Sequence, residues 1–310
     1  MSPPVLLACD AAYGMQLATS LRSIVESNRA SWPLDFFVLT SSFSETAQNK
    51  VLDSLPSGSA SIRWIPVDMV QFRQFSTATY ISTMTFARLL IPSVFPESVS
   101  RVLYLDADLL VLGNLSPLWD LDLDGHVIGG VIDAIDSHIK ANTPGFERVP
   151  RVREYFNAGV LLIDLDRWRK ECISERALEY LSQTPLSPYS DQDALNVACD
   201  GRWKQLDPRW NFQNHRHNRL SSMPPEQMPV VVHFVMQFKP WIVSSLSLNA
   251  DLWDDYRSRT CFARTPLEVA REAMQLAWYR SKYALSRYAL LRAAWHHLTA
   301  APNSKKKAIV

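Results

Sequence analysis

Short apolar runs alternate with helical patterns through most of the chain, and this alternation limits the folds open to it more than any other feature. The first part contains, in chain order, residues 5–9 (strand), 14–28 (helix), 36–40 (strand), 44–55 (helix), 62–67 (strand), 83–90 (helix ending before Pro92) and 102–105 (strand). Such alternation is typical of a doubly wound, mostly parallel sheet with helices on both faces. We therefore predict an α/β fold whose ligands bind at the carboxyl ends of the strands.

The remainder of the chain adds further elements and excludes several classes of protein. We expect strands at 127–132, 158–162 and 230–234 and helices at 165–182 and 191–199. Neither Gly-x-Gly-x-x-Gly nor Gly-x-x-x-x-Gly-Lys-Ser/Thr occurs, so the usual dinucleotide and P-loop sites are absent. The apolar runs are too short to span a membrane, no secretory signal is visible and the four cysteines are scattered. We therefore expect a cytoplasmic protein.

Charge is distributed unevenly, although 32 Lys and Arg nearly balance 31 Asp and Glu. Residues 265–310 contain eight basic residues and two acidic ones, which leaves the rest of the chain mildly acidic. Because such a body has no broad cationic track for phosphates, we expect no nucleic-acid partner.

The basic region is predicted to be a helical tail, with a helix over 268–298 that is also rich in aromatic residues. Basic and aromatic side chains favour a membrane interface, so we expect residues 265–310 to contact the cytoplasmic face of the inner membrane peripherally. The alternative is a helix that packs on the body and is followed by a solvated end.

Two carboxylates follow the strand predicted at 102–105, where Ala107 separates Asp106 from Asp108. Side chains at positions i and i+2 point to the same side of an extended chain. Two carboxylates at the rim of a buried sheet repel each other unless a cation lies between them. Oxygen ligands of this kind suit Mn²⁺ or Mg²⁺ together with substrate phosphates. A solvated pair of turn aspartates is the alternative.

The strand predicted at 230–234 carries His233, and Lys239 follows six residues later. An imidazole ligand favours Mn²⁺ over Mg²⁺, and a lysine can neutralise a phosphate oxygen. With the two aspartates, His233 would complete a metal site that leaves positions open for a diphosphate. Because a histidine satisfied within the core is the alternative, the hypothesis requires that its ring lie beside both aspartates.

A third polar segment, Asp191-Gln192-Asp193, stands at the predicted start of a helix. Carboxylate and amide side chains suit the recognition of sugar hydroxyls. Simple capping of the helix by Ser190 and Asp191 explains the same pattern without any function.

These features belong to an ordered set of motifs. The set comprises residues 5–10, Thr-Phe-Ala-Arg-Leu (85–89), Leu-Tyr-Leu-Asp-Ala-Asp (103–108), Gly-Val-Ile-Asp (130–133), Tyr-Phe-Asn-Ala-Gly-Val (155–160), Asp-Gln-Asp (191–193), Trp-Asn-Phe (210–212) and residues 233–241. Over roughly residues 5–260 the set resembles glycosyltransferase family 8, and especially the bacterial retaining α-galactosyl- and α-glucosyltransferases of lipopolysaccharide core synthesis.

The resemblance implies an enzyme and its organisation. It implies a GT-A catalytic domain over 1–262, with a Rossmann-like nucleotide-binding half (about 1–110) and an acceptor-side half (about 111–262), followed by the tail at 263–310. The implied enzyme is a metal-dependent hexosyltransferase that moves galactose or glucose, with retention, from a UDP-sugar to a saccharide or lipid-linked acceptor such as lipopolysaccharide core. Mn²⁺ is the implied ion, with Mg²⁺ as the alternative.

The resemblance also implies roles for individual residues. The implied metal ligands are Asp106, Asp108 and His233. The positions implied to bind the nucleotide donor, with Lys239 at the diphosphate, are Ala8, Asp10, Arg88, Asp106, Ala107, Asp108, Asn157 and Lys239. Gln192 would lie near the anomeric carbon, and Asp191 and Asp133 would orient hydroxyls and favour the developing positive charge. Front-face attack and a transient covalent adduct on Gln192 or Asp191 both stay open.

Three residues depart from the family's pattern. Ala11 and Ala12 replace an Asp-Asn pair before Tyr13, and Met236 replaces the glycine of a His-x-x-Gly pattern. These departures motivate an alternative, a catalytically idle sugar-nucleotide-binding or scaffold protein of a polysaccharide assembly. A metal-dependent phosphodiesterase or hydrolase would need a second metal cluster or a positioned base, whereas the only further histidine pair of the body, at 215 and 217, is expected in an acceptor-side loop over 207–229.

Overall fold

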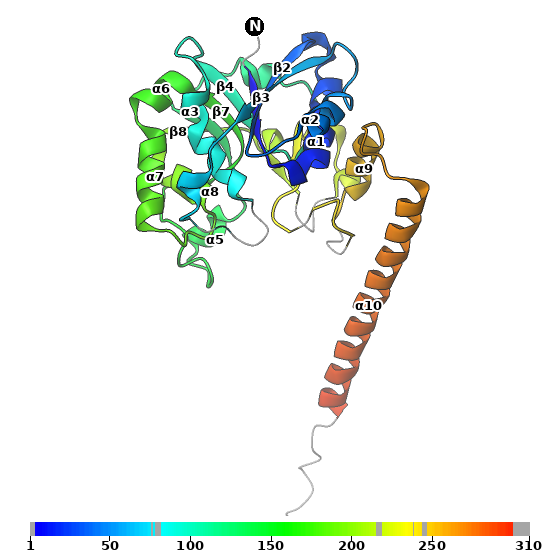
Figure 1. Ribbon diagram of the computed structural model, residues 1–310. Coiled ribbons are helices and arrows are strands. Elements are labelled where there is room, and N and C mark those ends of the chain that lie inside the picture. The colour runs from blue at the N-terminus through cyan, green and yellow to red at the C-terminus, as the bar shows by residue number, and fades with distance from the viewer. Residues whose placement is uncertain are drawn as a thin grey trace, which may run out of the picture. The chain divides into compact units, whose positions relative to one another are not determined.

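The computed structural model describes residues 4–75, 77, 82–214, 219–237, 239–243 and 247–299, with the side chains of the last helix described as far as residue 282. The chain divides into two units, Met1–Trp241 with Ser247–Ala263, and Ile242–Leu246 with Arg264–Val310. The strands belong to the first unit, and the long helix α10 (Pro266–Thr299) belongs to the second (Figure 1). The histidines at 215 and 217 lie outside the described residues.

A seven-stranded sheet runs through the first unit in the order β3-β2-β1-β4-β7-β6-β8 (Figure 1). Its strands are β1 (Val5–Ala8), β2 (Leu34–Thr40), β3 (Ala60–Pro66), β4 (Arg101–Leu105), β6 (Ile128–Ile132), β7 (Phe156–Asp164) and β8 (Trp203–Gln205). The four strands from β3 to β4 pair in parallel, as do β6 and β8, whereas β7 is antiparallel to both β4 and β6. The predicted α/β fold around a mostly parallel sheet is confirmed.

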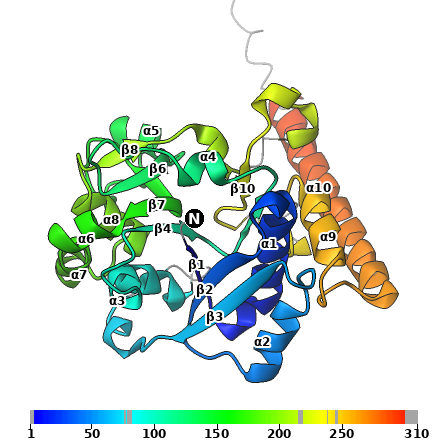
Figure 2. The same ribbon diagram turned by 90° about the horizontal axis from the view of Figure 1, so that it is seen from above.

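Helices cover both faces of this sheet. The helices of the first unit are α1 (Gly14–Ser27), α2 (Glu45–Leu52), α3 (Ile91–Val94), α4 (Ser116–Trp119), α5 (Asp136–Lys140), α6 (Leu165–Lys170), α7 (Ile173–Gln183), α8 (Asp191–Ala198) and α9 (Ala250–Ser258). Because alternate strand residues point to opposite faces, Val5 and Leu7 share a core with α1 and α2, whereas Leu6 shares another with α7 and α8. Figure 2 shows α1 and α2 on one side of the first strands and α3, α6, α7 and α8 on the other.

A smaller sheet places a late part of the chain beside the end of β4. It consists of β5 (Leu109–Val111), β10 (Val231–His233) and β9 (Phe212–Gln213), with β10 antiparallel to β5 and parallel to β9. Its register pairs His233 with Leu109, and the Phe234 amide donates to the Asp108 carbonyl oxygen at 3.1 Å. Backbone pairing therefore brings His233 to the end of β4.

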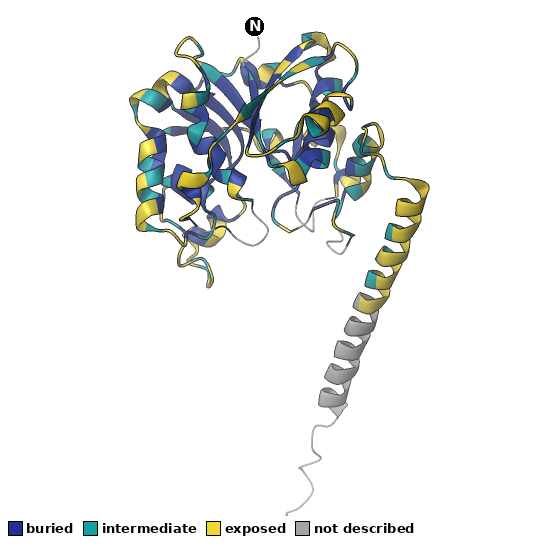
Figure 3. Cartoon of the chain, in the orientation of Figure 1, coloured by how far each residue is buried: buried dark blue, intermediate teal, exposed yellow. Residues whose placement is uncertain are grey.

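Buried residues concentrate in the strands and on the helix faces that pack against them (Figure 3). In the second unit, the described side chains of α10 are mostly exposed, and Leu267 and Trp278 are 80% and 56% exposed. None of the helices in the described part of the chain combines the length and the apolar character that crossing a bilayer requires.

The structure differs locally from the sequence predictions. The helix predicted over 165–182 is two helices, α6 and α7, because Cys172 between them takes a left-handed conformation with a φ of 52°. The helix predicted over 83–90 is present with these bounds as a 3₁₀ helix, but helical structure continues past it into α3, whose first turn tolerates Pro92. Of the alternative interpretation of the segment at 191–193, capping by the Ser190 side chain is not observed, and the Ser190 backbone has a φ of 53°.

Candidate functional site

A cavity opens where β1, β4 and β6 end, at the edge of the sheet where doubly wound folds bind ligands. Every site residue that the sequence predicts lines this cavity, namely Ala8, Asp10, Arg88, Asp106, Ala107, Asp108, Asp133, Asn157, Asp191, Gln192, His233 and Lys239. The fold therefore brings together residues that are spread from β1 to the segment after β10. Their individual roles remain predictions.

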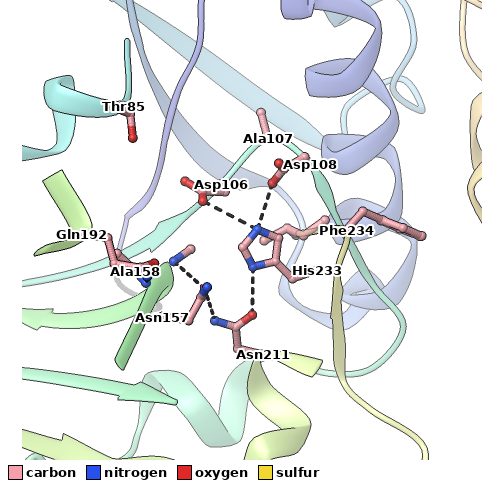
Figure 4. Close-up of polar contacts among 12 residues, drawn as sticks. Thr85, Asp106, Ala107, Asp108, Asn157, Ala158, Gln192, Asn211, His233 and Phe234 are labelled. Atoms are coloured by element: carbon pink, nitrogen blue, oxygen red, sulfur yellow. Dashed lines mark hydrogen bonds and ion pairs between the residues drawn. The ribbon is translucent and has the colours of Figure 1, made fainter. Parts of the chain in front are cut away.

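Asp106, Asp108 and His233 form a compact group of ligand atoms, all within 4.8 Å of one another. The Nε2 atom of His233 lies 3.1 Å from Asp108 Oδ1 and 3.7 Å from Asp106 Oδ2 (Figure 4). The histidine is only 4% exposed, and both aspartates are partly buried. Two carboxylates and an imidazole that converge on one point fit a divalent cation such as Mn²⁺. The ring thus lies beside both aspartates, as the metal-site hypothesis requires.

A second group of this kind is absent from the part of the chain that the structure describes. A metal-dependent phosphodiesterase or hydrolase would need such a second cluster or a positioned base, so this observation concerns one of the two requirements.

The buried guanidinium of Arg88 links the metal-site carboxylates to the other side of the cavity. Its Nη2 donates to Asp106 Oδ1 at 2.9 Å, and its Nε pairs with Asp191 Oδ2 at 2.8 Å. Its Nη1 donates to the Ala158 carbonyl oxygen at 2.6 Å. Burial disfavours the charged guanidinium, but Asp106 and Asp191 raise the pKa of Arg88 above its ordinary value. Arg88 is therefore a fixed positive charge that offsets two carboxylates.

Lys239 provides a second cation beside the metal site. Its Nζ lies 2.5 Å from Asp108 Oδ2 and donates to the Phe234 carbonyl oxygen at 2.6 Å. Burial opposes the ionisation of Asp108, yet Lys239 and His233 hold the pKa of Asp108 well below its usual range. The Asp108 carboxylate is therefore ionised at neutral pH and suited to bind a cation.

Asp191 and Gln192 open helix α8 and line the cavity opposite the metal site. The Thr85 hydroxyl donates to Asp191 Oδ1 at 2.5 Å. Burial raises the pKa of Asp191 to about 6, against the opposing effect of the neighbouring arginine and the Thr85 hydroxyl. The Gln192 amide is held at both ends, since its Oε1 accepts from the Ala158 N–H at 2.9 Å and its Nε2 donates to Asp133 Oδ2 at 3.1 Å.

The start of α8 is anchored by the buried Asp193. Its carboxylate accepts hydrogen bonds from the hydroxyls of Tyr155 and Ser187, each at 2.5 Å, and from the Tyr189 N–H at 2.9 Å. Ser190 precedes the helix with a φ of 53° and a ψ of −118°, a conformation that costs free energy for any residue with a side chain. This strained and anchored turn fixes the direction of the two polar residues that follow it.

Gly159 gives the metal site the room that it needs. A methyl group at this position would lie 2.7 Å from His233 Nδ1 and 2.8 Å from Asp106 Oδ2, closer than real contacts of a Cβ atom. A glycine in β7 is therefore required for the imidazole and the carboxylate to approach each other over the strand.

The departures from the family's pattern have different structural consequences. Ala11 and Ala12 form an exposed 3₁₀ turn with Tyr13, and of these three only Tyr13 lines the cavity. Met236 lines the cavity and keeps a left-handed backbone with a φ of 55°, which is uncommon for a bulky residue. The backbone conformation that suits a glycine is therefore retained, and a side chain is added beside Lys239.

Some residues that contact the predicted site residues were not singled out from the sequence. Among them are Thr85, Tyr104, whose hydroxyl donates to Asp106 Oδ1 at 2.8 Å, Gly159, and Asn211, whose Oδ1 lies 3.0 Å from His233 Nδ1. Each stands within one of the quoted motifs, which is the available signal. Most of their partners lie far away in the chain, so local sequence could not reveal them.

Replacing Gly159 with alanine should weaken Mn²⁺ binding by at least about tenfold, because the added methyl group displaces the His233 ring or the Asp106 carboxylate. Electron paramagnetic resonance of free Mn²⁺ during a protein titration measures the affinity. Gly130→Ala in β6 is the matched control, since its methyl group would meet Leu161 and Phe156 at an ordinary 3.5 Å. Equal Mn²⁺ affinity in the two folded variants would contradict the expectation.

Comparison with known proteins agrees with this geometry. The profile of glycosyl transferase family 8 matches residues 4–243. The glycosyltransferase GlyF of Streptococcus pneumoniae is 27% identical over an alignment of 322 residues, gaps included. This alignment covers 97% of this chain and 76% of GlyF. The lipopolysaccharide 1,3-galactosyltransferase of Salmonella typhimurium is 27% identical over 248 residues, which cover 74% of this chain and 72% of the relative.

Solved structures agree as well. The galactosyltransferase LgtC, crystallised with donor and acceptor sugar analogues, matches with a TM-score of 0.71 and 28% identity over 87% of this chain and 99% of LgtC. The fold is thus the GT-A fold that the motifs implied. With its profile match across most of the chain and its group of two aspartates and a histidine, the protein belongs to glycosyltransferase family 8, a family of metal-dependent glycosyltransferases.

Proposed function

We propose that this protein is a retaining hexosyltransferase that transfers galactose or glucose from a UDP-sugar to a saccharide acceptor, with Mn²⁺ as its ion. The observation that carries the proposal is the convergence of Asp106, Asp108 and His233 beside Lys239, on the wall of a cavity that Asp191 lines from the other side. A dense group of acidic and basic side chains at the carboxyl ends of the strands suits a diphosphate and a sugar together.

Residues at the ends of β1 and β4 would hold the nucleotide. Ala8 and Asp10 would contact the uracil and the ribose, and Asp106, Asp108 and His233 would hold the Mn²⁺ ion. When bound, this ion would supply positive charge against the diphosphate leaving group. We further propose a catalytic domain at 1–262, with a nucleotide-binding half over about residues 1–110 and an acceptor-side half over about 111–262.

The roles proposed for the other site residues follow from the charges that develop as the sugar is transferred. The bond from the sugar carbon to the phosphate oxygen breaks, so negative charge grows on UDP and positive charge grows on the sugar. Lys239 would stabilise the leaving diphosphate as a fixed cation. The carboxylates of Asp191 and Asp133 would orient sugar hydroxyls and favour the positive charge, and the doubly held amide of Gln192 would lie closest to the anomeric carbon.

Two routes would transfer the sugar with retention of configuration at its anomeric carbon. In front-face attack, the acceptor oxygen bonds to the sugar carbon on the side that UDP leaves, and its proton passes to the departing phosphate oxygen. In the other route, Gln192 or Asp191 first forms a covalent adduct that the acceptor then displaces. The acceptor that we propose is lipopolysaccharide core, since the Salmonella typhimurium relative described above is a lipopolysaccharide galactosyltransferase.

With Mn²⁺ present, the protein should release UDP from UDP-galactose or UDP-glucose and transfer the sugar to truncated lipopolysaccharide cores. Asp108→Ala should lower the rate by about 100-fold or more, because it removes a metal ligand and leaves Lys239 and His233 without their shared carboxylate. The exposed Asp120→Ala is the control. An idle sugar-nucleotide-binding protein would bind donor and release no UDP, which would refute the proposed transferase.

The rate of transfer should depend on the protonation of Asp191. Burial raises the pKa of this carboxyl to about 6, so the negative charge that favours the positive sugar is lost progressively as the pH falls through 6. The value of kcat/KM, which reports the free enzyme, should therefore fall about tenfold per pH unit below this point. In Asp191→Asn the remaining activity should lose this acid limb. A kcat/KM that stays level down to about pH 5 would argue against the assigned role.

The tail is proposed to attach the enzyme peripherally to the cytoplasmic face of the inner membrane. Its described part exposes Leu267, Met274 and Trp278 together with basic residues, as interfacial helices do. Deleting residues 265–310 should abolish cosedimentation with anionic phospholipid vesicles, whereas full-length Asp108→Ala should still sediment. Unchanged sedimentation of the truncated chain would contradict the membrane role.

A further inference from the structure

We propose that Asn211 is a positioning residue that fixes the tautomer of His233, through a one-directional chain of hydrogen bonds that reaches from the sugar side of the cavity to the metal site. The chain runs from Asp133 through Asn157 and Asn211 to His233. Figure 4 shows its last part, from Asn157 to His233. This inference rests on the metal site of the proposed function. It adds residues that hold no metal themselves but decide which nitrogen of the ring faces the ion.

The direction of the chain is set by Asn157. The backbone N–H of Gly159 donates to Asn157 Oδ1 at 3.0 Å, and a backbone N–H can only donate. The other end of the same amide, Nδ2, donates to Asp133 Oδ2 at 2.8 Å, and an ionised carboxylate can only accept. Two independent partners therefore give the same orientation for the Asn157 amide.

The orientation passes on to Asn211. Since Asn157 presents its oxygen, Asn211 must turn its Nδ2 towards it, and the two atoms are 2.8 Å apart. This leaves Asn211 Oδ1 facing His233 Nδ1 at 3.0 Å. An amide oxygen only accepts, so Nδ1 of the ring must carry the hydrogen.

The consequence for the metal site follows directly. With a hydrogen fixed on Nδ1, Nε2 is the ring nitrogen whose lone pair can bind a cation, and it is the atom that faces Asp106 and Asp108. A flipped amide at Asn211 would instead present an N–H to Nδ1 and place the hydrogen of the ring against the two carboxylates.

This chain of hydrogen bonds is buried, so a mismatch within it is costly. Asn211 is 1% exposed and Asn157 is 6% exposed, and His233 is equally hidden. A buried polar group without a partner costs roughly 1–3 kcal/mol, so a flip of one amide would leave its neighbours mismatched along the whole chain. Asp133, at the far end, also accepts from Gln192 Nε2 and thereby joins the predicted sugar contacts to the same network.

The first experiment observes the tautomer in the metal-free protein and needs no substitution. Long-range ¹H–¹⁵N correlation spectra of histidine-labelled protein show whether Nδ1 carries a hydrogen. The signal of His233 is assigned by its loss in His233→Gln. We expect a hydrogen on Nδ1. A ring of the wild-type protein whose Nδ1 carries no hydrogen would overturn the proposal.

The second experiment measures Mn²⁺ affinity without donor. Asn211→Ala should weaken Mn²⁺ binding about tenfold and should lose the single tautomer, because partners of metal-binding histidines typically contribute 10–100-fold. Asn211→Asp should keep the Nδ1–H form, since a carboxylate oxygen also accepts. The matched control is Asn214→Ala, a substitution of an equally buried asparagine whose amide bonds to Ser247, Leu248 and Asn249 instead of to the ring.

The outcomes separate this inference from the proposed function. Equal Mn²⁺ affinity in Asn211→Ala and Asn214→Ala would overturn the positioning role even if the wild-type enzyme transfers sugar. Conversely, a tautomer and a Mn²⁺ affinity that depend on Asn211, in a protein that releases no UDP from any UDP-sugar, would refute the transferase and leave the positioning role intact.

Discussion

Two aspartates held side by side in a partly buried cavity are the constraint on which the rest of the site depends. Asp106 and Asp108 would repel each other if they stood alone at the end of β4. Two cations offset this repulsion in the structure, Arg88 on Asp106 and Lys239 on Asp108, and the His233 ring lies beside both carboxylates. A site that keeps two carboxylates ionised and converging is already arranged for a divalent cation.

This constraint explains features of the fold that are otherwise unrelated. The small sheet of β5, β10 and β9 is needed because only its pairing carries His233 to the end of β4. Gly159 must lack a side chain because the imidazole and a carboxylate approach the strand at that point. The strained turn at Ser190 and the buried carboxylate beneath it hold the opposite wall of the cavity in place.

Family membership and specificity have different physical sources in this protein. The profile of glycosyltransferase family 8 covers the residues that form the sheet, its crossovers and the metal-binding group. Specificity generally lies in loops and single side chains rather than in the fold. Met236, which lines the cavity, is a side chain of this kind.

The sequence by itself determined the α/β class, the order of most strands and helices, and the set of residues that meets in the cavity. Apolar periodicity and polar residues at strand ends are local signals, and the ordered motifs identified the family. Only the tertiary structure decided the break at Cys172, the strain at Ser190 and the partners of Arg88, because these depend on contacts between distant segments. The same holds for Asn211, whose direction is set by an amide 54 positions away and by a backbone N–H in another strand. Hydrogen-bond direction is a property of the assembled network, and no local pattern of residues contains it.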